Sequence, residues 1–272
     1  MNRQVVVHPD ASTLVEATAA RLLVALLDLQ SVRRPVHLVL TGGTVGIDVL
    51  RAVAAGPLCP AVDWSGVHLW WGDERLLPDG DPERNEVQAR AALIDPLGDA
   101  LPAANVHAVP ALGPAAPDGE TAAARYVAEL AAYAAEGARA PRFDVLLLGL
   151  GPDGHVASLF PGRDTLAEAH QLVVAEHHSP KPPPERVSMT FPLITSAREV
   201  WLVAAGGQKA AAVASALSGA PVTTTPAAGA QGTERTLWLI DAAAAADVPV
   251  PDDGSGRAAE PPQTPPSTSQ RV

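Results

Sequence analysis

The stretch LLLGLGPDGHVASLFPG, Leu146–Gly162, opens with an apolar run and continues into three closely spaced glycines. These glycines have the spacing G-x-G-x-x-G, which is typical of the phosphate-binding turn in dinucleotide-binding folds. Asp153 and His155 lie inside the same glycine cluster. An apolar run that ends in such a turn is typical of an α/β fold. The turn itself is compatible with a nucleotide cradle, a catalytic loop or a tight turn alone.

The residues that follow the glycines favour a catalytic loop over a nucleotide cradle. A cradle requires a crossover helix, and a helix beginning near His155 would be interrupted by Pro161-Gly162 after about two turns. The carboxylate of Asp153 would also repel a pyrophosphate. At a helix N-terminus the macrodipole would keep the His155 imidazole neutral near pH 7, the form that a general base needs. We therefore predict His155 as a catalytic base, and a histidine that only caps the turn is the alternative.

Apolar runs alternate with helical patterns along most of the chain. The runs are mostly continuous, which is typical of strands in a parallel sheet covered on both faces. We expect strands over residues 5–8, 36–40, 67–71, 143–148, 172–175, 187–191, 200–204 and 237–240. We expect helices over residues 12–30, 45–54, 85–94, 120–136 and 208–217, with a short one after Asp241. This order predicts an α/β fold with a mostly parallel, doubly wound, Rossmann-like sheet and helices on both faces.

The composition is that of a globular protein with an acidic balance. The 272 residues carry a formal net charge of −11, which argues against non-specific binding to nucleic acid or to a membrane surface. Cys59 is the only cysteine, so the sequence has neither a disulfide framework nor a cysteine-rich metal site. The N-terminus lacks a signal-peptide pattern, and no apolar run reaches about 18 residues. We expect a cytoplasmic protein that binds neither nucleic acid nor membranes, and we expect a monomer.

The composition changes near residue 246. Residues 1–246 show no fixed-period repeat and no internal linker, so we expect a single α/β domain there. Residues 247–272 are rich in proline, serine, glycine and aspartate and end in PPQTPPSTSQRV. We predict a disordered tail over these residues, and a polyproline ligand for a partner protein is the alternative.

LVLTGGTVG, residues 38–46, is a second loop of interest. Gly42, Gly43 and Thr44 separate the expected strand from the expected helix. Backbone N–H groups at a glycine turn beside a helix N-terminus form a phosphate site, although a tight turn with a threonine cap has the same pattern. Ligands of open parallel sheets bind outside the carboxyl ends of the strands, which is where this loop lies.

WWGDERLLPDGDPERN, residues 70–85, follows the next expected strand. Asp73, Glu74 and Arg75 come directly after that strand, so we expect at least one of these charged side chains to point into the crevice. Asn85 opens the following helix. A solvated turn with a local ion pair is the alternative.

HHSPKPPPERVSMT, residues 177–190, supplies cations. Three consecutive prolines stiffen the chain between Lys181 and Arg186, which favours a clamp for an anion, although a rigid surface loop has the same composition. Lys209 opens another helix after two glycines, where a cation opposes the helix dipole unless an anion is bound. Lys181 and Lys209 are the only lysines among the 19 basic residues.

Together these motifs resemble those of the 6-phosphogluconolactonases. The similarity runs over about residues 1–246 and comprises, in order, TGG, WWGDER, Asn85 at a helix start, GLGPDGHVASLFPG, SPKPPPERVSMT and GGQKAAAV. The first loop departs from the S-G-G-S-T-P that is usual in that family, since this chain has TGGTVG. Glucosamine-6-phosphate deaminases and isomerases share the fold and a G-x-G-x-DGH loop. Their loop continues toward F-N-E-P, which ASLFPG does not match.

The resemblance implies hydrolysis of 6-phospho-D-glucono-1,5-lactone to 6-phospho-D-gluconate without a metal or an organic cofactor. His155 would deprotonate the attacking water and return the proton to the ring oxygen, and Asp153 would orient His155 or bind a sugar hydroxyl. The implied substrate- and phosphate-binding residues are Gly42, Gly43, Thr44, Asp73, Arg75, Asn85, Gly154, Lys181, Arg186 and Lys209. An aldose–ketose isomerase or deaminase of an amino-sugar phosphate, and a sugar-phosphate sensor on the same fold, are the alternatives.

Overall fold

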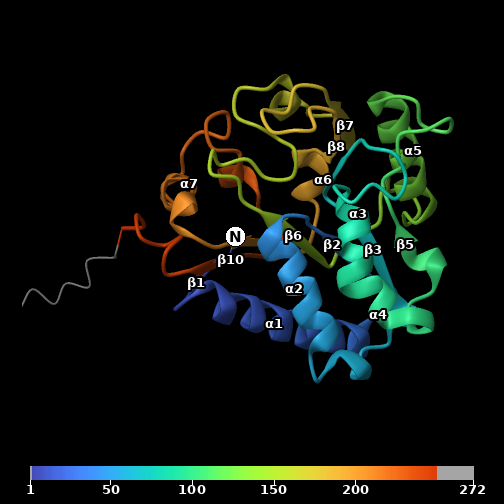
Figure 1. Ribbon diagram of the computed structural model, residues 1–272, viewed down its shortest axis with the longest axis horizontal. Coiled ribbons are helices and arrows are strands. Elements are labelled where there is room, and N and C mark those ends of the chain that lie inside the picture. Colours follow the sequence, from blue (N-terminus) through green and yellow to red (C-terminus); the bar gives the residue numbers. More distant parts are fainter. Residues whose placement is uncertain (1, 250–272) are drawn as a thin grey trace, which may run out of the picture.

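The computed structural model describes residues 2–249, which form two β-sheets and the helices packed against them (Figure 1). The larger sheet has seven strands, all parallel, in the order β1-β10-β9-β6-β2-β3-β5. These strands are β1 (Asn2–His8), β10 (Arg235–Asp241), β9 (Glu199–Ala204), β6 (Val145–Gly149), β2 (Val36–Leu40), β3 (Val67–Trp71) and β5 (Val106–His107). The predicted α/β fold with a mostly parallel sheet is confirmed.

The smaller sheet is antiparallel, in the order β4-β8-β7, and Figure 1 shows β7 and β8 near α5 (Gly119–Ala132). Its strands are β4 (Asp73–Arg75), β8 (Arg186–Met189) and β7 (Val173–Glu176). The strands predicted over residues 172–175 and 187–191 are therefore present, but they lie outside the parallel sheet. The register sets Arg75 opposite Arg186 and Asp73 opposite Ser188, so this sheet brings two predicted site segments together.

The helices begin and end largely where the sequence predicts. Asp10 and Asp118 cap the two longest helices, since each carboxylate accepts a hydrogen bond from a backbone N–H three residues later. A π-helical segment over Arg90–Ile94 continues α3. The helices other than α5 are α1 (Ala11–Val32), α2 (Thr44–Ala55), α3 (Asn85–Ala89), α4 (Asp95–Leu97), α6 (Phe191–Ile194) and α7 (Ala210–Leu217).

The connections cover both faces of the parallel sheet. From β1 to β2, β3 and β5 the chain moves toward one edge, and from β5 to β6, β9 and β10 it moves back. Because crossovers between parallel strands are right-handed, α1 to α4 lie on one face and α5 and α7 on the other. Burial on both sides explains why every residue of β2 is buried.

The strand order reverses between β2 and β6, which are neighbours in the sheet. β2 leads to β3 on one side, and β6 leads to β9 on the other. In doubly wound sheets a crevice opens at the carboxyl ends of such a strand pair, because the loops that follow diverge to opposite faces. The loops after β2 and β6 are TGG and GPDGH, the two glycine turns of the sequence.

Three predictions of secondary structure are wrong. Residues 151–161 form turns where a helix was expected to begin near His155. The helix expected over residues 120–136 ends at Ala132. The residues after Asp241 form turns, although its carboxylate accepts a hydrogen bond from Ala244 N as a helix cap would. Residues 250–272, which make up most of the predicted tail, lie outside the described residues.

Candidate active site

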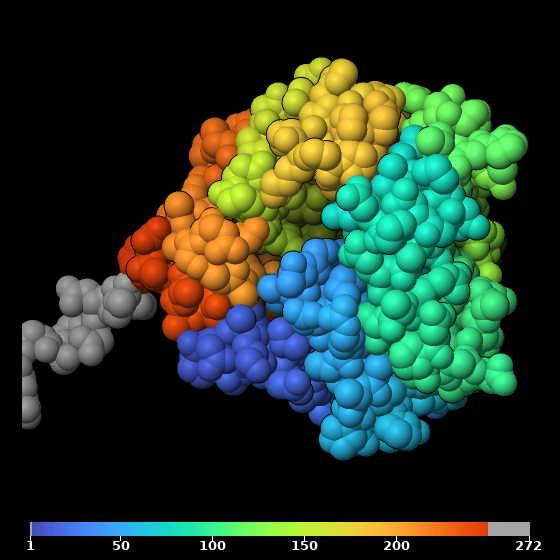
Figure 2. Space-filling view, viewed as in Figure 1, coloured from blue at the N-terminus to red at the C-terminus, as the bar shows by residue number. Residues whose placement is uncertain are grey.

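A cavity of about 240 Å³ opens at the carboxyl ends of β2 and β6. In Figure 2 it corresponds to the hollow where the blue α2, the cyan segment after β3, the yellow-green loop after β6, the amber loop before β8 and the orange α7 meet. The predicted site residues that line it are Gly42, Gly43, Asp73, Arg75, Asn85, His155, Lys181, Arg186 and Lys209. Residues from five segments of the sequence thus converge on one cavity.

His155 and Asp153 form a hydrogen-bonded pair at the wall of this cavity. Nδ1 of His155 lies 2.5 Å from Oδ1 of Asp153, so a neutral ring donates its Nδ1 proton to the carboxylate. Among residues 2–249, Nε2 has no hydrogen-bond partner and is the nitrogen left to accept a proton. Burial opposes ionisation of Asp153, but the hydrogen bond from His155, together with the positive charge of that ring when it is protonated, lowers the pKa of Asp153 to about 2.

The loop that carries His155 is built from turns. Gly151 N donates to His155 O at 2.9 Å, and Gly154, with a φ of +83°, donates from its N to Gly151 O at 3.0 Å. The backbone bonds therefore close within the loop, and the predicted effect of a helix dipole on His155 is wrong. A Cβ at Gly151 would collide with the His155 ring and with Asp153, so only glycine allows the pair to fold back over the turn.

Ser158 joins this loop to the smaller sheet. Its side chain is fully buried, and its hydroxyl donates to Oδ2 of Asp73 at 2.7 Å. Its backbone N–H donates to Oγ of Ser188 in β8 at 3.1 Å. Phe160 packs against His155 with ring centroids 4.5 Å apart. The position of His155 is therefore fixed from both sides of the loop.

Glu74, one of the three charged residues that directly follow β3 in the sequence, organises the start of α3. One carboxylate oxygen accepts hydrogen bonds from the backbone N–H groups of Arg75 and Asn85, and the other accepts from Glu86 N. The guanidinium of Arg84 lies 3.8 Å away, and both side chains are buried. Burial raises the pKa of Glu74 to about 7, although Arg84 and the three N–H donors counteract it. This carboxyl group fixes the backbone from which Asn85 projects.

Asn85 connects the loop after β2 with β4. Its Nδ2 donates to the backbone oxygen of Asp73 at 3.0 Å. Its Oδ1 is buried and has no hydrogen-bond partner among residues 2–249. A Cβ at Gly42 would collide with this oxygen, so Gly42 permits the close approach of the two loops. Since Asn85 lines the cavity, its Oδ1 is a candidate acceptor for a substrate hydroxyl.

Cations outnumber carboxylates around the cavity. Burial lowers the pKa of Lys209, and the positive charge of Lys181 lowers it further. The two ammonium groups are therefore close enough to repel each other. A bound anion would relieve both effects. The cationic lining residues are Arg75, Lys181, Arg186 and Lys209, beside the carboxylate of Asp73. In a chain of net charge −11, this concentration of positive charge marks a site for an anionic ligand.

Arg186 shapes the proline-rich loop as well as lining the cavity. Its Nε donates to Pro183 O, and one terminal nitrogen donates to Lys181 O and Pro182 O, each at 3.2 Å. Burial also lowers the pKa of this guanidinium. The fixed relation that the sequence predicts between Lys181 and Arg186 is thus made by these hydrogen bonds together with the prolines.

Two predicted site residues lie just outside this cavity. Thr44 lines an adjoining cavity of about 180 Å³ that shares Gly42, Gly43 and Lys209 with it. Gly154 forms the turn beneath His155 and packs against Thr225. Thr41 was not predicted to contribute, yet it lines the cavity and its hydroxyl accepts a hydrogen bond from Gly149 N at 3.1 Å. Its position directly before the two glycines was the signal that could have indicated it.

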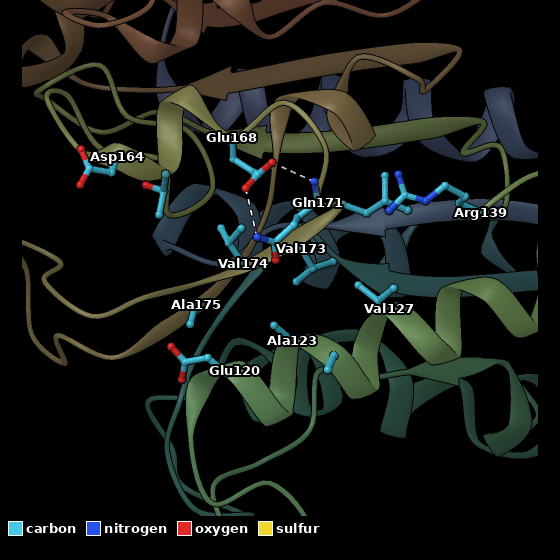
Figure 3. A pocket seen from close by; sticks show the side chains of 13 residues that line it. Glu120, Ala123, Val127, Arg139, Asp164, Glu168, Gln171, Val173, Val174 and Ala175 are labelled. Carbon is cyan, nitrogen blue, oxygen red and sulfur yellow. Dashed lines mark hydrogen bonds between the residues drawn. The ribbon is translucent and has the colours of Figure 1, made fainter.

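A larger cavity, about 540 Å³, lies elsewhere, between α5 and β7 (Figure 3). Its floor is apolar, with Ala123 and Val127 of α5 facing Val173 of β7, and Glu120 lies at one end. Glu168 uses its carboxylate to accept hydrogen bonds from nearby backbone N–H groups. His155, its partner Asp153 and the cations converge on the smaller cavity, which we therefore take as the candidate active site.

Two further properties concern residues 2–249 as a whole. Within them, no three histidine, cysteine, aspartate or glutamate side chains are arranged to hold a metal ion. In the same range, no helix is both long enough and apolar enough to cross a membrane.

Comparisons with known proteins show the family to which the chain belongs. Residues 9–238 match the family described as glucosamine-6-phosphate isomerases/6-phosphogluconolactonase. The 6-phosphogluconolactonase of Streptomyces coelicolor is 53% identical over 249 residues, which cover 90% of this chain and 95% of that protein. That of Mycobacterium leprae is 47% identical over 250 residues, covering 92% and 100%. The solved 6-phosphogluconolactonase of Trypanosoma brucei matches with a TM-score of 0.79 and 25% identity, covering 91% and 99%.

Proposed function

The chain belongs to the family of glucosamine-6-phosphate isomerases and 6-phosphogluconolactonases, and from this premise we propose that His155 is the general base of its reaction. The enzyme hydrolyses 6-phospho-D-glucono-1,5-lactone to 6-phospho-D-gluconate, a step of the oxidative pentose phosphate pathway. The observation that supports the role of His155 is its Nδ1 contact with Asp153, which leaves Nε2 at the wall of a cationic cavity.

The reaction needs one proton carrier. Nε2 of His155 takes a proton from a water molecule, whose oxygen attacks the lactone carbonyl carbon and forms a tetrahedral oxyanion. The oxyanion then collapses, the bond between that carbon and the ring oxygen breaks, and the imidazolium returns its proton to the ring oxygen. Asp153 holds the ring in the correct tautomer and stabilises the imidazolium between these steps.

The cations of the cavity bind the phosphate and stabilise the oxyanion. Lys181 and Arg186 bind the phosphate, since the loop that carries them is rigid and its charges face the cavity. The turn at Gly42 and Gly43 precedes the N-terminus of α2, whose first backbone N–H groups have no acceptor within the helix. These groups, with Arg75 and Lys209, are further candidates for the phosphate and for the oxyanion.

Lactone hydrolysis by wild type and by His155→Ala tests the proposal, with the spontaneous rate subtracted. We expect kcat to fall about 10²-fold or more, the usual contribution of a general base. His170→Ala, at an exposed histidine, serves as the matched control and should retain the wild-type rate. An unchanged rate for His155→Ala would remove His155 from the mechanism. Release of ammonia from glucosamine 6-phosphate, without lactone hydrolysis, would contradict the assigned reaction itself.

A further inference from the structure

His177 lies between two carboxylates at the base of the proline-rich loop. Its Nδ1 is 2.7 Å from Oε2 of Glu185, at the other end of the loop. Its Nε2 is 2.7 Å from Oε1 of Glu120, in the first turn of α5. Glu120 is also seen at one end of the cavity in Figure 3. One imidazole thus connects both ends of the loop to a helix of the main fold.

This geometry requires a doubly protonated ring. A neutral imidazole has one donor nitrogen and one acceptor nitrogen, and the acceptor would face a carboxylate at 2.7 Å. The two carboxylates raise the pKa of His177. The other titratable groups that face it are Asp118, the N-cap of α5, and His178, whose ring centroid is 6.3 Å away. Carboxylates face both ring nitrogens of His177, so the imidazolium is the form that fits.

The loop that His177 closes carries two of the cations proposed to bind phosphate. Ser179 N donates to Pro184 O at 3.1 Å, so the loop ends are adjacent, and Glu185 directly precedes Arg186. Lys181 is at the tip, and its backbone oxygen is held by Arg186. Movement of Glu185 away from α5 would therefore move both cations relative to the cavity.

We propose that His177, as an imidazolium bridging Glu120 and Glu185, is a positioning residue that holds Lys181 and Arg186 in place for the phosphate of the substrate. This inference rests on the proposed phosphate contacts of those two residues. The bridge exists below the pKa of His177 and is lost as the pH rises through it. Substrate affinity should therefore decline with rising pH through loss of the bridge, while the proton transfer at His155 continues.

Steady-state kinetics of His177→Gln, which cannot form an imidazolium, test this role. We expect KM for the phosphorylated lactone to rise about 3- to 10-fold at low pH, the scale of two partly exposed ion pairs lost together, with kcat little changed. KM for unphosphorylated gluconolactone should not change. Raising the pH should increase KM of the wild type more than that of His177→Gln. His178→Gln is the matched control, since its ring makes no hydrogen bond among the described residues.

Lys181→Ala separates this inference from the proposed function. If Lys181→Ala raises KM for the phosphorylated lactone and His177→Gln does not, the bridge is overturned and the phosphate contact stands. If Lys181→Ala has no effect either, the phosphate contact itself fails. An NMR titration of the His177 ring provides a readout besides activity, because Glu120→Gln should lower its pKa. An unchanged His177 pKa in that variant would also overturn the bridge.

Discussion

At the residue scale, the hydrogen bond between His155 and Asp153 determines which ring nitrogen is left to take a proton. The carboxylate accepts from Nδ1, so the lone pair is on Nε2. Gly151 makes this arrangement sterically accessible, because any larger residue would occupy the space of the ring. The glycines of the opening stretch therefore allow the close packing of His155 and Asp153, and the match to a dinucleotide fingerprint follows from their spacing alone.

Asp153→Asn tests the orienting role of the carboxylate. The amide keeps the size of the side chain but cannot stabilise an imidazolium by charge, so we expect kcat to fall roughly 10- to 100-fold, less than in His155→Ala. Steady-state lactone hydrolysis measures the effect. The substitution Asp164→Asn, at an aspartate in the wall of the larger cavity, should leave kcat at the wild-type value. A wild-type kcat in Asp153→Asn would show that the ring is held by its packing on Phe160 alone.

At the element scale, the catalytic loop depends on the smaller sheet for its position. The Ser158 hydroxyl and the Asp73 carboxylate form a buried hydrogen bond between the loop and β4. Asp73 also lines the cavity, so this hydrogen bond connects the loop that carries His155 with a residue of the candidate site. Removing the hydroxyl would leave a buried carboxylate oxygen without that donor, which is costly in a low-dielectric interior.

Ser158→Ala is expected to lower the free energy of unfolding by about 1–3 kcal/mol and also to reduce kcat/KM. Denaturant unfolding followed by lactone kinetics on the same samples measures both. Ser31→Ala, at an exposed serine of α1, is the control and should change stability by less than about 0.5 kcal/mol. Loss of stability with full activity would show that the link to β4 does not position His155.

The parts of these elements that could be predicted are those that depend on local pattern. Continuous apolar runs such as β2 and β6 indicated buried parallel strands, and the glycines after them indicated the loops of the site. The turn at His155 could not be told from a helix start, because the same polar and glycine residues favour both. The pairing of β7 and β8 with β4 depends on contacts between distant segments. The Glu74 network likewise exists only once β4 and α3 meet.

At the scale of the whole molecule, charge varies strongly from place to place. The chain carries a net charge of −11 and has a pI of about 5.1, yet the active site is cationic. Three histidines lie on neighbouring strands of the parallel sheet: His37, His68 and His107. Nδ1 of His68 is 2.8 Å from Nε2 of His107, and Trp70 donates to Nδ1 of His37 at 3.1 Å. Such a cluster is compatible with neutral rings and not with three positive charges.

Burial, together with the fields of His68 and His107, lowers the pKa of His37 to about 4. Burial also lowers the pKa of His68 and, despite the contact with Glu129, that of His107. An unfolded chain protonates these rings near pH 6.5, so it binds more protons than the folded chain between about pH 6.5 and 4. The histidines therefore stabilise the fold at neutral pH, and this contribution is lost as the pH falls. Glu74 acts in the opposite sense, since its raised pKa lowers stability as the pH rises from about 4.5 to 7.

Denaturant unfolding of wild type and His37→Gln between pH 7 and 4 tests this balance. Acidification through the pI changes the net charge of both proteins alike, so the difference between their curves isolates the histidine. Over this range the free energy of unfolding of the wild type should fall by about 3 kcal/mol more than that of the variant. This difference corresponds to a histidine pKa of 6.5 in the unfolded chain and about 4 in the folded chain. In the wild type, protonation of Glu74 stabilises the fold as the pH falls and so offsets part of the effect of the histidines. Glu74→Gln removes this offset, so the free energy of unfolding should fall more steeply on acidification than in the wild type. Parallel curves for wild type and His37→Gln would show that the buried histidines do not control the acid stability of the fold.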